Sequence, residues 1–189
     1  MGKIVLTLAV TLDGYISGPN GEIDWLVKDE AKDFGDTLAE ILDGVDAIFY
    51  GRISYDLWGN YLPDEKASAK LKESYAVLHS KTKYVFSKTR EGDTGKAIFI
   101  TSDIKEKILE IKQKMNGNIW LYGGSKLITT ILNLGLVDEY KLAVHPVILG
   151  KGIPLFKDIN ERISLKLLDT QQSTSGVIVL NYEAVAAKH

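Results

Sequence analysis

The chain has 189 residues, of which 45% are hydrophobic and 25% charged, and its formal net charge is -2. These values are typical of a single globular domain over residues 1–189 with a full hydrophobic core, and they provide no basic surface for nucleic acid. The chain contains no cysteine, which excludes disulfides, thiolate nucleophiles and thiolate metal sites.

The first apolar run extends from Ile4 to Leu12 and ends in Asp13-Gly14. Its nearly continuous, β-branched composition predicts a central strand that is covered on both faces. The run is too short to span a bilayer and no small-residue cleavage site follows it, so we interpret it as a strand and not as a signal peptide. No other stretch approaches the about 18 apolar residues of a membrane span. We therefore expect a cytoplasmic protein that does not bind membranes.

The glycine, proline and asparagine residues of segment 13–21 predict a long loop of the kind that often covers a site. A helical segment is expected to follow residues 24–26 and to end near Gly44. Its apolar face would carry Ala31, Phe34, Leu38, Ile41 and Leu42.

Apolar periodicity and turn residues place the remaining elements. Further helices are predicted at 51–59, 66–79, 103–115 and 125–135, and further strands at 45–50, 83–86, 97–101, 119–122, 137–144, 163–169 and 177–185. Strands that alternate with helices and finish in a hairpin predict an α/β fold, with a mostly parallel sheet, helices on both faces and an antiparallel edge.

Three of these strands run directly into residues that suit phosphate binding, at segments 50–52, 86–88 and 122–124. Right-handed crossovers would bring the carboxyl ends of parallel strands to one rim, where open α/β sheets bind their ligands. The sequence therefore predicts a binding site at this rim.

Glycines supply the first part of the predicted site. Gly51 and Gly124 each precede an expected helix start, where backbone N–H groups favour an anion. The pair Gly123-Gly124 lets a pyrophosphate approach the backbone closely, and Ser125 is placed to cap the helix. Because the full G-x-G-x-x-G pattern is missing, a simple tight turn is the alternative interpretation.

Cations supply the second part. Arg52 offers a fork of donors that suits a phosphate, and Lys88, next to Ser87, adds another positive charge. Two phosphate cradles with an extra arginine and lysine fit NADP better than a mononucleotide. The alternatives are a surface ion pair for Arg52 and a solvated charge for Lys88.

The loop region also contains candidate catalytic residues. Asp13, Asp24 and Trp25 lie where the site would be covered, and a buried carboxylate there would have a raised pKa and act as an acid. Alternatively, Asp13 shapes an Asp-Gly turn, Asp24 caps the next helix and Trp25 is a packing residue. The three histidines are too far apart in the sequence to predict a metal site.

Two segments resemble dihydrofolate reductases: residues 49–55 resemble their strand-Gly-Arg-x-Thr-helix segment, and residues 121–125 their double-glycine segment. Segments 12–18 and 146–156, with Asp24-Trp25-Leu26, are more similar to the C-terminal reductase domain of the bifunctional riboflavin-biosynthesis deaminase-reductase and to its stand-alone relatives. The resemblance covers almost the whole chain, including the order of its elements.

The resemblance implies an eight-stranded dihydrofolate-reductase-like fold that binds NADPH, with the nicotinamide under the loop after the first strand. Arg52, Lys88 and Ser87 would bind the adenosine 2′-phosphate, and Ser54 would meet the pyrophosphate. The implied cofactor-binding residues are Gly51, Arg52, Ser54, Ser87, Lys88, Gly123, Gly124, Ser125, Lys126 and Leu127.

Two features depart from the family pattern. The zinc deaminase half and its cysteines are missing, so the chain cannot perform the paired deaminase and reductase reactions. The acidic residue that assists proton transfer on the first helix of dihydrofolate reductases has no secure counterpart, since both Asp33 and Asp36 lie nearby.

These observations predict an NADPH-dependent reductase that transfers a hydride to a small heterocyclic substrate, pteridine-like or pyrimidine-like, or to a carbonyl substrate. The alternatives are a true dihydrofolate reductase and a non-catalytic nucleotide-binding regulatory protein. Related reductase domains often form dimers, so we expect a homodimer, to which the apolar segment 146–156 either contributes or packs internally.

Overall fold

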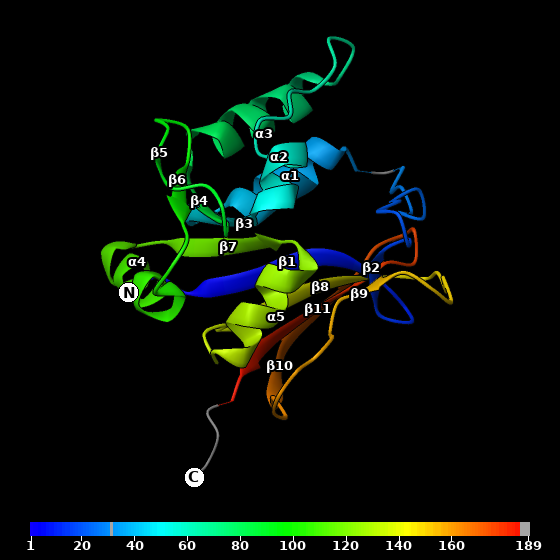
Figure 1. The fold of residues 1–189 in the computed structure, drawn as a ribbon. Helices are drawn as coiled ribbons and strands as arrows, with labels where there is room; N and C mark the ends of the chain where they lie inside the picture. The colour runs from blue at the N-terminus through cyan, green and yellow to red at the C-terminus, as the bar shows by residue number, and fades with distance from the viewer. Residues whose placement is uncertain (31, 186–189) are drawn as a thin grey trace.

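The computed structural model describes residues 1–30 and 32–185, and its centre is a nine-stranded mixed sheet (Figure 1). Its strands, in spatial order, are β10 (Leu165–Gln172), β11 (Ile178–Ala184), β8 (Glu139–His145), β1 (Ile4–Thr11), β7 (Asn118–Gly123), β3 (Val45–Gly51), β4 (Thr82–Phe86), β6 (Ile98–Ile100) and β5 (Gly92–Asp93). Strands β8, β1, β7, β3, β4 and β6 are parallel neighbours, whereas β10, β11 and β5 pair antiparallel.

This architecture confirms the predicted α/β fold class. Each predicted strand is present, and the two-residue strand β5 adds a ninth at the edge. A second, two-stranded sheet pairs β2 (Tyr15–Ser17) with β9 (Ile153–Pro154). Segment 13–21, which was predicted as a loop, and the apolar segment 146–156 therefore contact one another through these short strands.

Helices cover both faces of the sheet (Figure 1). The helices are α1 (Phe34–Leu42), α2 (Arg52–Trp58), α3 (Ala69–Ser80), α4 (Ile104–Lys114) and α5 (Ser125–Asn133). One core cluster contains the apolar side chains of α4 and α5, and the other contains those of α1, α2 and α3. None of the helices within the described residues is long and apolar enough to cross a bilayer.

The first helix begins later than its apolar pattern predicted. Asp33 is the N-cap of α1 and its carboxylate accepts the Gly35 N–H at 2.6 Å. Before this cap, the Val27 N–H donates to His145 Nδ1 at 3.1 Å. This stretch is therefore held against the end of β8 and does not form a helix. Ala31, which the prediction placed on the apolar face, lies outside the described residues.

Candidate functional site

The three phosphate-type turns lie together because β3 is flanked by β7 and β4 in the sheet. In the parallel register, Gly51 is opposite Phe86 on one side, and Tyr50 is opposite Gly123 on the other. The carboxyl ends of these strands therefore form one edge, as the sequence predicted.

The turns after β3 and β7 approach so closely that side chains would fill the space between them. A Cβ atom on Gly51 would lie 3.2 Å from the Gly124 backbone nitrogen, and one on Gly124 would lie 3.1 Å from Ser54 Oγ. Gly123 has a φ of +118°, which side-chain-bearing residues rarely adopt. Two backbone turns and the Ser54 hydroxyl thus form a narrow polar cradle that fits a pyrophosphate.

Neither helix that starts at this cradle has a side-chain cap. The N-cap residues of α2 and α5 are Gly51 and Gly124. Ser125 is the first residue of α5, so the prediction that it caps this helix was wrong. The Gly124 carbonyl instead accepts the N–H groups of Leu127 and Ile128, at 3.0 and 3.1 Å. Lys126 is exposed, and Leu127 is buried beneath the turn.

A cluster of charges lies beside the cradle at the start of α2. Arg52 Nη1 donates to Asp56 Oδ2 at 2.6 Å, and Arg90 Nη1 donates to Asp56 Oδ1 at 2.8 Å. The surface ion pair that was the alternative for Arg52 is therefore present. Sequence reasoning missed Asp56 and Arg90; only the i,i+4 spacing of Arg52 and Asp56 was a visible signal.

Ser87 organises the turn that carries the other cations. Its side chain is buried, and its hydroxyl accepts the N–H groups of Thr89 and Arg90, at 3.2 and 3.1 Å. Lys88 is exposed on this turn. The Arg90 guanidinium carbon lies 5.9 Å from the centre of the Phe99 ring, which further restricts the arginine.

Asp13 joins the loop after β1 to the loop after β8. Its carboxylate accepts the Thr11 hydroxyl at 2.6 Å and the N–H groups of Gly150 and Leu149, at 2.7 and 3.2 Å. The hydrogen bond from Thr11 is the main cause of a lowered pKa for Asp13. The prediction of a buried carboxylate with a raised pKa is therefore wrong for Asp13, because this carboxylate is exposed and held ionised by its hydrogen bonds, which fits an anchor better than a proton donor. Asp24 is also exposed, and the catalytic role of both stays a prediction.

Two buried polar groups have no hydrogen-bond partner within the described residues: Trp25 Nε1 and the Tyr50 hydroxyl. Trp25 packs edge-on against His145, with ring centroids 5.4 Å apart. Tyr50 directly precedes Gly51, and its ring centroid lies 4.7 Å from that of Tyr122. Burial, reinforced by Tyr122, raises the Tyr50 pKa, so its hydroxyl keeps its proton. Both groups are hydrogen-bond donors whose capacity is unused within the described residues, and Tyr50 is 0% exposed in the core cluster under α1, α2 and α3.

His145 makes the stability of this region depend on pH. Its Nδ1 atom accepts the Val27 N–H, and burial lowers its pKa below the ordinary value of about 6.5. As the pH falls below about 6.5, the unfolded chain binds a proton that the folded chain excludes, which costs at most about 1.4 kcal/mol per pH unit.

We therefore expect the free energy of unfolding to fall less in His145→Gln than in the wild type between pH 7.5 and 5.5, about one unit each side of the usual histidine pKa. The glutamine amide oxygen can accept the same N–H. Urea unfolding of both proteins at the two pH values measures the effect. Parallel losses in the wild type and the variant would contradict this role of His145.

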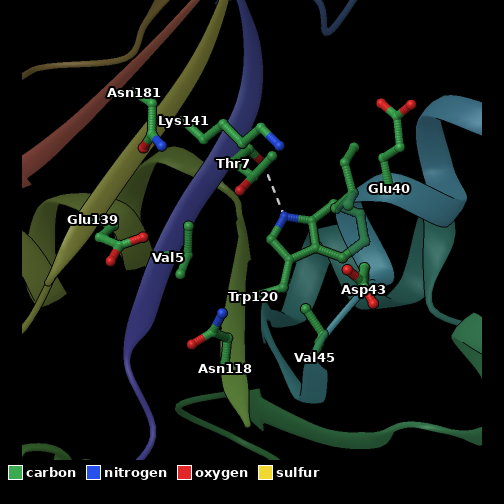
Figure 2. A pocket seen from close by; sticks show the side chains of 11 residues that line it. Val5, Thr7, Glu40, Asp43, Val45, Asn118, Trp120, Glu139, Lys141 and Asn181 are labelled. Atoms are coloured by element: carbon green, nitrogen blue, oxygen red, sulfur yellow. Dashed lines mark hydrogen bonds between the residues drawn. The ribbon is translucent and has the colours of Figure 1, made fainter. Parts of the chain in front are cut away.

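A cavity of about 160 Å³ lies elsewhere, between α1 and the sheet (Figure 2). Val45 and Asn118, the first residues of β3 and β7, line it, so it opens at the amino ends of the strands. Trp120 forms one wall and donates its indole N–H to the Thr7 carbonyl at 2.9 Å. The cavity is at the opposite end of these strands from the glycine cradle.

Comparison with solved structures places this fold among the dihydrofolate-reductase-like proteins. A protein assigned to riboflavin biosynthesis from Shewanella sp. PV-4 superposes with a TM-score of 0.77, at 23% identity, over 98% of this chain and 99% of that one. Dihydrofolate reductase from Enterococcus faecalis, solved with NADP(H), superposes with a TM-score of 0.61, at 15% identity, over 97% of this chain and 96% of that one. At these identities the likeness shows the fold.

The sequence itself defines the family more narrowly. Residues 2–179 match the model of the RibD C-terminal domain, and the chain belongs to this family of reductase domains. The uncharacterized protein YyaP of Bacillus subtilis (strain 168) is 49% identical over 180 residues, which cover 95% of this chain and 94% of that protein. The resemblance to the riboflavin-type reductase domain is therefore confirmed.

Proposed function

We propose that this protein is an NADPH-dependent reductase that transfers a hydride to a small pyrimidine-like or pteridine-like heterocycle, or to a carbonyl substrate. The observation that carries the proposal is the convergence of the Gly51 turn, the Gly123-Gly124 turn and the Arg52 cluster on one edge of the sheet. This edge offers one place for a pyrophosphate and a neighbouring place for a further phosphate.

The residues divide between the two ends of the cofactor. Ser54 and the two glycine turns would hold the pyrophosphate, and Arg52, with Ser87 and Lys88 on the next turn, would hold the adenosine 2′-phosphate. Ser125, Lys126 and Leu127 would line the far side of the cradle at the start of α5. When bound, the nicotinamide ring supplies the hydride, and the protein positions the substrate and excludes water.

The substrate would bind near the nicotinamide, under the loop that Asp13 anchors. Asp13 is our candidate to orient the substrate, and Asp24 is our candidate to assist proton transfer. Trp25 offers a buried N–H donor without a partner in the described chain. Membership of the RibD C-terminal family favours this function over that of a true dihydrofolate reductase.

A thermal-shift comparison of NADPH, NADH, FMN and no nucleotide tests the cofactor, because a ligand that binds the native state raises the midpoint with its concentration. We expect a shift with NADPH and none with FMN. An unchanged unfolding midpoint with both nicotinamide nucleotides at millimolar concentration would contradict the proposal. Binding without turnover on pyrimidine, pteridine and carbonyl compounds would favour a nucleotide-binding regulatory protein, and rapid turnover of dihydrofolate would favour a true dihydrofolate reductase.

Arg52→Ala is expected to weaken NADPH binding more than NADH binding. A charge-assisted hydrogen bond to a phosphate contributes about 1.5 to 3 kcal/mol, which is about tenfold to a hundredfold in affinity. Titration calorimetry with both nucleotides measures the difference, and Arg162→Ala, an exposed arginine in the loop before β10, is the matched control. Equal losses for NADPH and NADH would remove Arg52 from the 2′-phosphate site.

The homodimer stays a proposal. Segment 146–156 is divided in the structure, since Leu155 is buried in the core and β9 pairs with β2, whereas Ile148 is 72% exposed. Only the exposed part of this segment is free to contribute to a contact between two copies.

A further inference from the structure

We propose that Asp56 sets the choice between NADPH and NADH in this protein. The inference rests on the proposed function and deepens it, because it assigns a specificity-determining residue to the adenosine end of the site. It is carried by the carboxylate that Arg52 and Arg90 share.

The shared carboxylate occupies the position where an anion is expected to bind. Arg52 donates to one oxygen of Asp56 at 2.6 Å and Arg90 to the other at 2.8 Å, so the carboxylate bridges the two guanidinium groups. Each guanidinium has five N–H donors, and the bond to Asp56 uses one from each among the described residues. The cluster therefore combines two cations and one anion, with donors left for a ligand.

The two cofactors present opposite chemistry to such a cluster. NADPH carries a phosphate at the adenosine 2′ position, and arginine binds this phosphate. NADH carries a hydroxyl there, which donates a hydrogen bond to an acidic side chain. Asp56 competes with the phosphate for the guanidinium donors and repels its negative charge. The same carboxylate is an acceptor for the 2′-hydroxyl of NADH. Asp56 thus holds down the affinity for NADPH and supports that for NADH.

The backbone fixes this cluster relative to the cradle. Arg52 directly follows Gly51, the N-cap residue of α2, and Asp56 lies one turn further along that helix. Arg90 comes from the neighbouring strand end, where its backbone N–H donates to the Ser87 hydroxyl. The three charged side chains therefore lie next to the pyrophosphate cradle, on two adjacent strand ends.

Asp56→Asn tests the proposal, because it removes the charge and keeps the size of the side chain. We would measure dissociation constants by titration calorimetry for four nucleotides: NADPH, NADH, adenosine 2′,5′-bisphosphate and adenosine 5′-monophosphate. The last two carry the 2′ difference without the nicotinamide. Glu110→Gln on α4 removes one exposed charge elsewhere, from an ion pair with Lys107, and is the matched control.

We expect the ratio of NADPH to NADH affinity to rise by about tenfold in Asp56→Asn, as does the ratio for the adenosine pair, with no change in Glu110→Gln. The gain should shrink at high salt, since these side chains are partly exposed. An unchanged or reduced ratio in Asp56→Asn, with nucleotides still bound, would overturn this inference alone. No binding of any of the four nucleotides by the wild type would overturn the proposed function and this inference with it.

Discussion

Replacing Gly124 by alanine is expected to weaken NADPH binding by about a hundredfold while the protein still folds. Gly124 has φ -81° and ψ -168°, an extended conformation that alanine adopts readily. The new Cβ would stand 3.1 Å from Ser54 Oγ, inside the cradle where we place the pyrophosphate. Displacing the pyrophosphate loses charge-assisted hydrogen bonds of about 1.5 to 3 kcal/mol each, so two weakened bonds account for the expected loss.

Gly124 is a sharper test of the cradle than either neighbouring glycine. A side chain at Gly123 is strained by its φ of +118° whatever the space around it, so loss of binding there would be confounded with loss of folding. A side chain at Gly51 would lie 3.2 Å from the Gly124 backbone nitrogen, so it would disturb the backbone of the cradle itself.

The control for Gly124→Ala is the double variant Ser54→Ala/Gly124→Ala. Removing the Ser54 hydroxyl relieves the contact with the new methyl group, so any lost thermal stability should return. The methyl group still fills the cradle and the Ser54 hydroxyl is also lost to the pyrophosphate, so NADPH affinity should stay low. Calorimetry and thermal unfolding on the same samples separate the two effects. Normal NADPH affinity in the single variant would contradict a pyrophosphate site at this turn.

Much of the fold could be predicted from the sequence because apolar runs mark its buried strands. Ile4, Leu6, Ile119 and Leu121 are all 0% exposed, and each lies in a run that predicted a strand. Strand β5 could not be predicted in this way, because Gly92-Asp93 is exposed and has no apolar pattern. The late start of α1 depends on a contact between Val27 and His145, which are 118 positions apart, so no local pattern indicates it.

Some residues of the site can likewise be recognised from their neighbours in the sequence, whereas others come together only in the folded chain. Gly51, Ser54 and the glycine pair were visible because a strand runs into a glycine turn and a helix within a few residues. Arg90 lies in a loop without periodicity, and its partner Asp56 is 34 positions away. The pairing follows from the adjacency of β3 and β4, which neither segment encodes alone.

The second large effect is expected at the ion pair between the buried Lys112 of α4 and the partly exposed Asp138, the residue before β8. Lys112 is only 3% exposed, and its ammonium donates to Asp138 Oδ2 at 2.5 Å. The same oxygen accepts the Ile4 N–H at 2.7 Å, so one carboxylate joins α4, the start of β1 and the approach to β8. Asp138→Ala should lower the free energy of unfolding by about 3 kcal/mol, near the lower end of the usual cost for breaking a buried pair.

The lower end is expected because the Asp138 side chain is 35% exposed, so water can reach the ammonium group once the carboxylate is gone. Replacing both partners removes the buried charge altogether. Lys112→Met/Asp138→Ala should therefore be more stable than Asp138→Ala alone, although it carries one more substitution. Urea unfolding of the single and double variants measures this difference. Glu110→Ala, which breaks the exposed ion pair with Lys107, is the control and should lower the free energy of unfolding by less than about 1 kcal/mol. If the loss of unfolding free energy in the double variant equalled the sum of the losses in Lys112→Met and Asp138→Ala, the result would contradict a stabilising interaction between the two side chains.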